Sequence, residues 1–277
     1  MRIAYLGPAG TFTEDALREA GAGADYEALH TATVHDAIMA VDRGTAERAL
    51  VPFENSIEGS VRATLDTLAL DAEQVTIVGE YDYAVRPCLI ARREIALEEI
   101  EAVLSHPQPL AQCARFIREQ LTRAEQRVVS STAEAVREVS RSEAAWAALG
   151  TQSAARLYGC VVLRDGVEDV SDNVTRFVWI APRGTEPEGD GVWKTSLVFA
   201  ELGEDHPGAL VEALLEFSDR DVNLTRIESR PLRRGLGRYM FFVDLEGAED
   251  DPAVSAAIDG LRGKAESVRL LGSYPVA

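Results

Sequence analysis

Few residues of this chain could form a disulfide framework or a membrane anchor. The 277 residues include three cysteines, Cys88, Cys113 and Cys160, and their odd number and wide spacing predict reduced thiols, neither disulfides nor a metal site. No apolar run approaches the ~18 residues that suggest a membrane span. The N-terminus has neither the apolar core nor the cleavage site of a signal peptide. We therefore expect a cytoplasmic protein of roughly two domains.

Positive charge is also scarce. Lysine and arginine together number 28 against 46 acidic residues, which gives a formal net charge of −18. This balance argues against nucleic acid and anionic membranes as partners, because the basic footprint that they require is missing. The only lysines are Lys194 and Lys264. An anionic ligand would therefore have to be held by arginine, by hydroxyl groups or by backbone N–H groups.

Strand and helix patterns alternate through the first part of the chain, which is typical of α/β folds. The predicted helices are Glu14–Ala20 with Thr13 as N-cap, a helix from the cap Thr33 to Gly44, Val61–Leu70 with Ser60 as N-cap, Pro107–Leu121, Thr132–Val139 and Gln152–Tyr158. The predicted strands are Arg2–Leu6, Ala49–Val51 closed by Pro52, segments near Val128, Ala147 and Val161, and Phe177–Ile180, which Pro182 stops.

The composition changes at Pro182–Gly191, where glycine, proline and acidic residues gather in a stretch typical of a linker. After it the predicted elements are a strand over Thr195–Leu202, a helix over Gly208–Ser218, strands over Val222–Arg230 and Tyr239–Leu245, a helix over Pro252–Leu261 and a strand over Val268–Tyr274. This order is β-α-β-β-α-β, the ferredoxin-like unit.

Four polar stretches stand where strand patterns meet loops or helices. They are GPAGTFTEDA (Gly7–Ala16), VPFENSIEGSV (Val51–Val61), LSHPQPLAQC (Leu104–Cys113) and DNVTRFVWIAP (Asp172–Pro182). Ligands of open α/β sheets bind beyond the carboxyl ends of strands, where the first three stretches are expected to lie. The glycines of the first stretch would aim backbone N–H groups at an anion. Together the stretches could hold a small anion or donate hydrogen bonds to a leaving group.

Simpler structural interpretations remain open at each stretch. His106 could be a surface or capping histidine, and Asn173 could cap its own turn, belong to a glycosylation acceptor or line a cleft. A cytosolic location removes the glycosylation alternative. On a strand, Thr175 and Phe177 share one face and Arg176 takes the other. No Ser-His-Asp order, paired metal ligands or full dinucleotide fingerprint is evident.

Together these stretches resemble the motifs of the prephenate dehydratase family. GPAGTFTEDA resembles the family's Gly-Pro-x-Gly-Thr-aromatic-Ser opening with Thr13 in place of serine, and VPFENSIEGSV matches Val-Pro-x-Glu-Asn-Ser-x-x-Gly-x-Val. SHPQPLAQC matches with Pro109 where alanine is more usual, NVTRF matches Asn-x-Thr-Arg-Phe, and ALGTQSAA is a looser fit. HPGALVEALLEF and NLTRIESRP resemble the phenylalanine-binding ACT domain of these enzymes.

The resemblance implies an α/β fold with a two-lobed catalytic domain, like a periplasmic binding protein, followed by a ferredoxin-like ACT domain. The implied boundaries are residues 1–182 for the catalytic domain, 183–193 for the linker and 194–277 for the ACT domain. Lobe one would comprise about 1–75 plus 176–182, and lobe two about 76–175. The resemblance also implies no metal and no organic cofactor. A fused chorismate mutase is expected to be absent, since only one strand precedes Gly7.

The implied activity is the decarboxylating dehydration of prephenate to phenylpyruvate in L-phenylalanine biosynthesis. By resemblance Thr175 donates a hydrogen bond to the departing ring hydroxyl, and Arg176 either binds charge or braces the lobes. The implied catalytic residues are Thr175, Arg176, Glu54, Asn55, Ser105 and Gln112, and the implied substrate-binding residues are Thr11, Ser56 and Phe177.

The ACT resemblance implies L-phenylalanine as an effector that acts through the linker region, and a homodimer or homotetramer. The implied effector contacts are Gly208, Ala209, Leu210, Asn223, Glu228, Ser229, Arg230 and Pro231. Three alternatives remain open: an arogenate dehydratase, a non-aromatising decarboxylase that would not need the Thr175 donor, and a non-catalytic small-molecule sensor with an ACT module.

Overall fold

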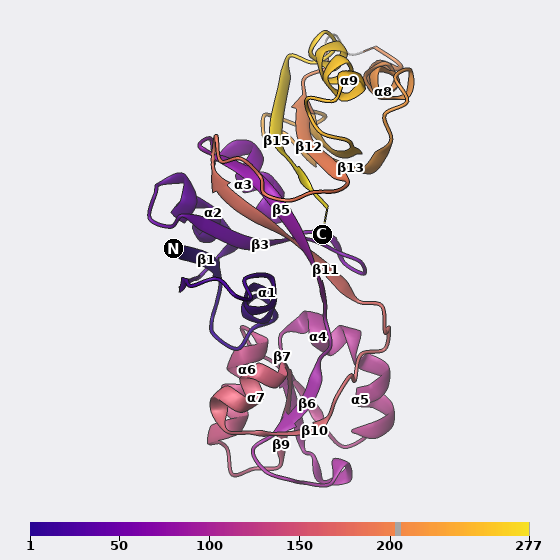
Figure 1. Ribbon diagram of the computed structural model, residues 1–277. Helices are drawn as coiled ribbons and strands as arrows, with labels where there is room; N and C mark the ends of the chain where they lie inside the picture. The colour runs from indigo at the N-terminus through magenta and orange to yellow at the C-terminus, as the bar shows by residue number, and fades with distance from the viewer. Residues whose placement is uncertain (203–205, 277) are drawn as a thin grey trace. The chain divides into compact units, whose positions relative to one another are not determined.

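The computed structural model describes residues 1–202 and 206–276, which form three β-sheets flanked by helices (Figure 1). The chain contacts define two compact units. The first unit comprises Met1–Ala37, Leu50–Gly59 and Asp82–Phe177, and the second comprises Ile38–Ala49, Ser60–Tyr81 and Val178–Ala277. Within the described ranges, no helix combines the length and apolar character needed to cross a membrane.

The largest sheet has the strand order β2-β1-β3-β11-β5, and β4 pairs with β3. Its strands are β1 (Arg2–Leu6), β2 (Glu27–Thr31), β3 (Arg48–Asn55), β4 (Gly59–Ser60), β5 (Val75–Ala84) and β11 (Val174–Pro182). The helices between them are α1 (Phe12–Ala20), α2 (Val34–Asp42) and α3 (Arg62–Leu70). β1 and β2 pair in parallel across α1, so β2 is a strand of the α/β pattern that the sequence analysis did not predict.

The five-stranded sheet belongs to the first unit and has the order β10-β6-β9-β7-β8. Its strands are β6 (Cys88–Ala91), β7 (Ala102–Ser105), β8 (Glu125–Val128), β9 (Trp146–Gly150) and β10 (Val161–Arg164). Its helices are α4 (Pro107–Gln112), α5 (Ala114–Gln120), α6 (Thr132–Arg141) and α7 (Gln152–Tyr158), with a short 3-10 helix η1 (Leu97–Glu99). Alternate strand residues pack in two cores, one with α4 and α5 and one with α6 and α7, so helices cover both faces.

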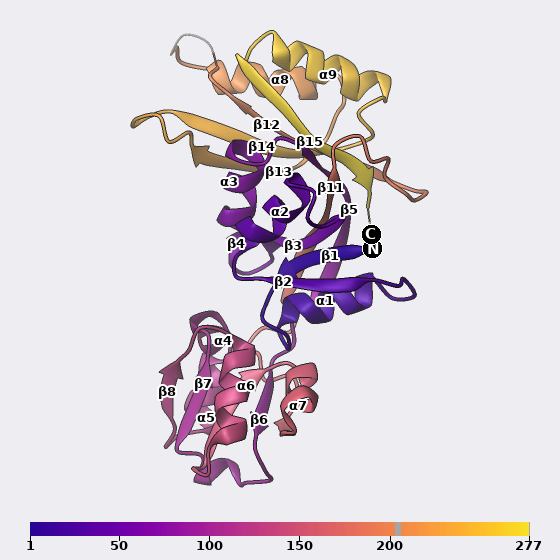
Figure 2. The same ribbon diagram turned by 90° about the vertical axis from the view of Figure 1, so that its left-hand side faces the viewer.

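The four-stranded sheet belongs to the second unit and has the order β13-β14-β12-β15. Its strands are β12 (Trp193–Ala200), β13 (Leu224–Pro231), β14 (Tyr239–Glu246) and β15 (Ser267–Pro275). The helices α8 (Ala209–Ser218) and α9 (Pro252–Arg262) lie side by side on one face, where Phe217 and Ile258 join the core with Phe199 (Figure 2). The predicted β-α-β-β-α-β order is confirmed.

The same sheet also packs against α3 and β5 within the second unit. The Lys194 ammonium lies 2.7 Å from both carboxylate oxygens of Glu80. The Thr76 hydroxyl donates to the carbonyl oxygen of Leu271 at 3.2 Å. At Gly272 an added Cβ would stand 2.2 Å from the carbonyl oxygen of Ile77, so only glycine fits this close approach.

Two predicted helix caps are wrong and one is confirmed. Helix α1 begins at Phe12, and its cap is Thr11, whose hydroxyl accepts from the Glu14 N–H, while Thr13 is buried inside the helix. The cap of α3 is Val61, which has no side chain able to accept a hydrogen bond. Ser60 instead accepts a hydrogen bond from Arg226 at 2.6 Å, a partner 166 residues away that the sequence does not reveal. The Thr33 cap of α2 is confirmed by its bond from the Asp36 N–H.

Several element boundaries also differ from prediction, and two of the differences have an evident physical reason. Strand β3 continues through Pro52 to Asn55, because Phe53 beyond the proline is fully buried and its burial outweighs one missing N–H donor. The predicted helix Pro107–Leu121 is interrupted at Cys113. The Asp169 carboxylate accepts the N–H groups of Arg115 and Phe116 at 2.8 and 3.1 Å, so a distant residue caps a second helix start there.

Candidate active site

The polar residues beyond β3 lie against the polar start of β11 in the first unit. The Ser56 N–H donates to the Val174 carbonyl oxygen at 2.9 Å. The Ser56 hydroxyl accepts from the Val174 N–H at 3.0 Å and donates to the Asp172 carbonyl oxygen at 3.1 Å. The polar start of β11 is therefore hydrogen-bonded to the residue that follows the end of β3, whose last residue is Asn55.

Asn55 is the centre of this cluster and is only 6% exposed. Its Oδ1 accepts the backbone N–H groups of Ile57 and Glu58, each at 3.0 Å. Its Nδ2 lies 2.7 Å from Oδ1 of Asn173 and 3.0 Å from Oγ1 of Thr175. The asparagine side chain thus joins its own turn to the start of β11.

A second amide continues the network toward helix α4. Asn173, 1% exposed, donates from Nδ2 to Oε1 of Gln112 at 3.1 Å. Gln112 is 8% exposed, and its buried Nε2 has no hydrogen-bond partner among the residues that the structure describes. A buried N–H group left without an acceptor is costly, so this atom points to a place where a ligand oxygen could bind.

Thr175 accepts a hydrogen bond and keeps its own hydrogen. Asn55 Nδ2 can only donate, so Oγ1 of Thr175 is the acceptor in their 3.0 Å contact. Thr175 is 9% exposed and shares the buried face of β11 with Phe177, as the strand alternation predicts. The remaining hydroxyl hydrogen is available to a ligand.

Arg176 takes the other face of β11, also as predicted. Its Nη2 lies 2.9 Å from a carboxylate oxygen of Glu54, and its guanidinium stacks 4.9 Å from the centroid of the Phe53 ring. Two residues of β3 therefore hold the arginine in place. This geometry favours a bracing role over direct binding of a ligand's charge.

Three other residues predicted to contact the substrate, Ser105, Phe177 and Ser56, use their side chains in contacts within the protein. The Ser105 hydroxyl is fully buried and donates to the Leu149 carbonyl oxygen at 2.8 Å. The Phe177 ring is 2% exposed and packs edge-on against Tyr83 at 6.4 Å. Ser56 uses its hydroxyl both as donor and as acceptor. Their roles at a substrate stay predictions, and these contacts favour positioning of the backbone.

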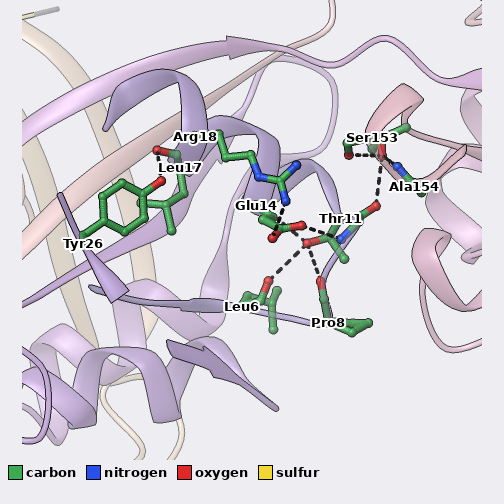
Figure 3. Close-up of polar contacts among 11 residues, drawn as sticks. Leu6, Pro8, Thr11, Glu14, Leu17, Arg18, Tyr26, Ser153 and Ala154 are labelled. Carbon is green, nitrogen blue, oxygen red and sulfur yellow. Dashed lines mark hydrogen bonds and ion pairs between the residues drawn. The ribbon is translucent and has the colours of Figure 1, made fainter. Parts of the chain in front are cut away.

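The glycine-rich loop before α1 already contacts an anion of its own chain (Figure 3). The Glu14 carboxylate accepts the Gly10 N–H at 2.6 Å and also pairs with Arg18 at 2.9 Å. The Thr11 hydroxyl donates to the Pro8 carbonyl oxygen at 3.0 Å and accepts the Glu14 N–H at 3.4 Å. The prediction that Thr11 and its neighbouring amides take a substrate carboxylate therefore stays untested, because Glu14 occupies the Gly10 donor here.

A pocket of about 540 Å³ lies in the second unit beside the start of α8. Gly208, Ala209 and Leu210 from the predicted effector motif line it, together with Tyr239 and Phe241 of β14. Gly208 caps the helix with φ of +101°, a conformation that glycine adopts readily. Asn223 and the Glu228–Pro231 segment are not among the described residues that line this pocket. The structure therefore brings only part of the predicted effector-binding set together.

Arg230 of that segment makes a different contact. Its guanidinium pairs with Asp66 of α3, with Nε 3.1 Å from Oδ1 and Nη2 2.7 Å from Oδ2. This bond uses the arginine inside the second unit and leaves its predicted contact with an effector untested.

The described residues offer no cluster of three or more histidine, cysteine or acidic side chains able to hold a metal ion. Burial raises the pKa of Cys113 to about 12, and the same cause, with the Asp165 carboxylate nearby, raises that of Cys88 to about 12. Both thiols are therefore protonated and unreactive at neutral pH, as expected of core cysteines.

The fold and this site together define an α/β enzyme with a C-terminal ACT domain. The chain belongs to the prephenate dehydratase family, lyases whose family model matches residues 3–185, and an ACT-domain model matches residues 197–263. Its fold matches solved structures of that family, as the resemblance implied.

The proteins with similar sequences include both prephenate dehydratases and arogenate dehydratases. A prephenate dehydratase of Mycobacteroides abscessus is 41% identical, and the match covers 99% of this chain and 90% of the relative. Arogenate dehydratase 2 of Petunia hybrida is 37% identical over 99% of this chain and 72% of the relative.

Two solved structures are similar over almost the whole chain. The prephenate dehydratase of Arthrobacter aurescens, solved in complex with L-Phe, has a TM-score of 0.91 and 38% identity over 99% of this chain and 90% of its own. A protein described as a novel type of quorum-quenching acylase has a TM-score of 0.88 and 32% identity over 100% of this chain and 98% of its own.

Proposed function

We propose that this chain converts prephenate to phenylpyruvate, carbon dioxide and water. The observation that carries the proposal is the state of the Thr175 hydroxyl, which accepts from Asn55 at 3.0 Å and keeps its hydrogen for a ligand. A threonine hydroxyl is a poor acid at neutral pH but a competent hydrogen-bond donor. Such a donor suits a leaving hydroxide.

The reaction makes modest demands on the protein. The bond between the ring and its carboxylate breaks, and its electron pair enters the ring, which becomes aromatic. The opposite C–O bond breaks and hydroxide departs, to be protonated by solvent. The enzyme must hold a dianion, orient it and stabilise the departing oxygen. A neutral set of amides and a hydroxyl, as in the cluster of Asn55, Gln112, Asn173 and Thr175, fits this task.

Gln112 is the second proposed substrate contact. Its Nε2 is buried without a partner among the described residues, and a substrate oxygen would satisfy it. Asn55 contacts Thr175 directly and orients that hydroxyl. Arg176 and Glu54 brace the ends of β3 and β11 through their ion pair.

The test is a pair of turnover assays. One follows phenylpyruvate formation from prephenate, and the other follows phenylalanine formation from arogenate. Arogenate carries an amino group on the side chain in place of the keto oxygen and would yield phenylalanine. Rapid phenylpyruvate formation supports the proposal, while turnover of arogenate alone would identify the chain as an arogenate dehydratase. No turnover of either substrate would favour the sensor alternative.

An acylase activity has less support from the site. Amide hydrolysis through a side-chain nucleophile needs an activated group next to a base. Ser105 is fully buried and bonded to a backbone carbonyl oxygen, and Thr175 accepts its hydrogen bond from an amide, which is not a base.

We also propose that L-phenylalanine regulates the chain through its ACT domain. The pocket beside Gly208, Ala209 and Leu210 and the L-Phe complex of the similar structure support this proposal. We further propose a homodimer or homotetramer, by family resemblance, in which ACT domains pair across their sheet edges. We also propose a cytoplasmic location, as the sequence predicts.

A further inference from the structure

We propose that Asn173 is a positioning residue that fixes which atom Gln112 presents to the substrate. The role rests on the proposed function. Asn173 is 1% exposed and lies between two other buried amides. Its Oδ1 is 2.7 Å from Nδ2 of Asn55, and its Nδ2 is 3.1 Å from Oε1 of Gln112.

Two backbone donors determine the direction of the first amide in this row. The N–H groups of Ile57 and Glu58 can only donate, so the Asn55 atom 3.0 Å from each of them is the oxygen. Asn55 therefore presents its nitrogen to Asn173. Because that nitrogen can only donate, the Asn173 atom that accepts its hydrogen bond is the oxygen Oδ1.

The same logic passes from Asn173 to Gln112. With its oxygen committed to Asn55, Asn173 presents its NH₂ group, and Gln112 accepts with Oε1. The other arm of Gln112 is then the donor Nε2, which is buried and has no partner among residues 1–202 and 206–276. The direction of each hydrogen bond is thus fixed, from the backbone N–H groups of Ile57 and Glu58 to the buried Nε2 donor of Gln112.

This polarity cannot come from the shape of Gln112 alone. The oxygen and nitrogen ends of a side-chain amide have nearly the same size, so a half-turn would present an acceptor in place of a donor. An acceptor would repel a carboxylate or a departing hydroxide. Asn173 prevents the half-turn because it supplies both one acceptor and one donor. Aspartate lacks the donor when ionised, and leucine of similar size lacks both.

A merely structural role would give Asn173 no influence on Gln112. In that interpretation the asparagine ties the segment before β11 to the end of β3, and any change of size or polarity would act through packing. The two roles differ in their dependence on protonation. An aspartate at position 173 can accept from Asn55 in either state, but it can donate to Gln112 only when protonated.

The experiment compares Asn173→Asp with the wild type in prephenate turnover across pH, using only the pH range in which thermal melts show both proteins folded. At neutral pH we expect kcat/KM to fall about 10- to 100-fold, which corresponds to one lost hydrogen bond to a charged group. The activity ratio of variant to wild type should rise as the pH falls, because the carboxylic acid regains the donor. A ratio independent of pH would overturn the positioning role.

A second background ties the effect to Gln112. The Gln112→Ala variant has no amide at position 112 to orient. In that background, the activity ratio with and without the Asn173→Asp change should therefore not depend on pH. If Asn173→Asp fails to fold, Asn173→Ala is tested in both backgrounds, and a smaller loss with Gln112→Ala than with Gln112 supports the inference. Equal losses in both backgrounds would refute it. Absence of prephenate turnover in the wild type would instead refute the proposed function.

Discussion

Arg230 of β13 and Asp66 of α3 form a bidentate ion pair within the second unit. The contacts are 3.1 Å from Nε to Oδ1 and 2.7 Å from Nη2 to Oδ2, and the side chains are 15% and 11% exposed. Arg233 also reaches the Asp66 carboxylate from the protein surface. The motif that resembles an effector-binding segment therefore forms an ion pair with a helix that lies inside the residues matched by the prephenate dehydratase model.

Loss of Asp66 should destabilise the protein strongly. Asp66→Ala leaves the Arg230 guanidinium unpaired in a nearly buried place, and breaking such a pair costs about 3–5 kcal/mol. We expect a clear fall in Tm measured by scanning calorimetry. The matched control is Asp259→Ala, which breaks the exposed pair with Arg262 and should cost about 0–1 kcal/mol. Equal effects of the two variants would contradict the importance of the buried pair.

Removal of the Thr175 hydroxyl should impair chemistry and spare folding. Thr175→Val keeps the shape of the side chain and loses its donor, so we expect kcat to fall about 10²- to 10⁴-fold in the phenylpyruvate assay with little change in prephenate binding. Thr175→Ser should keep a large part of the activity. Thr122→Val, at an exposed position, serves as the control and should have nearly normal kcat. A Thr175→Val enzyme with normal kcat would remove the hydroxyl from the mechanism.

Substitution of Gly208 should weaken phenylalanine binding. Gly208 has φ of +101° and lines the pocket beside α8, so a valine would strain the helix start and narrow the site. By calorimetry we expect at least about 10-fold weaker binding, or about 1.4 kcal/mol. Gly23→Val is the matched control, because Gly23 also has a positive φ, +90°, and lies outside the pocket. Unchanged affinity in Gly208→Val would place phenylalanine elsewhere.

Asp15 should make stability depend on pH. Burial, the largest cause, raises its pKa in the folded state, while hydrogen bonds from Ser153 and Thr151 lower it. A raised carboxyl pKa means that the folded state binds the proton more tightly, so this group costs stability once the pH rises above its folded pKa. Asp15→Asn should therefore raise Tm at pH 7 and change it little near pH 3. A lower Tm of Asp15→Asn at pH 7 in thermal melts would show that the hydrogen bonds from Ser153 and Thr151 outweigh the cost of burying the carboxylate.

Local sequence signals determined most of the helices and the order of the elements in the C-terminal unit. Hydrophobic periodicity, the glycine- and proline-rich linker and the Thr33 cap all act over a few residues, so the α/β pattern and the C-terminal β-α-β-β-α-β unit could be read directly from the chain. The motifs around Asn55, Gln112 and Thr175 also identified the residues that the structure joins in one network.

Only the tertiary structure decided which groups bond to one another. Asn55 and Asn173 are 118 residues apart, and nothing local to either determines which end of its amide faces the other. Likewise Ser60 appears in sequence as a helix cap but bonds to Arg226, and Asp169 caps a helix that it follows by more than forty residues. The physical reason is that a side-chain hydrogen bond depends on distance and direction in space, which chain neighbours do not fix when the partner comes from another strand or helix.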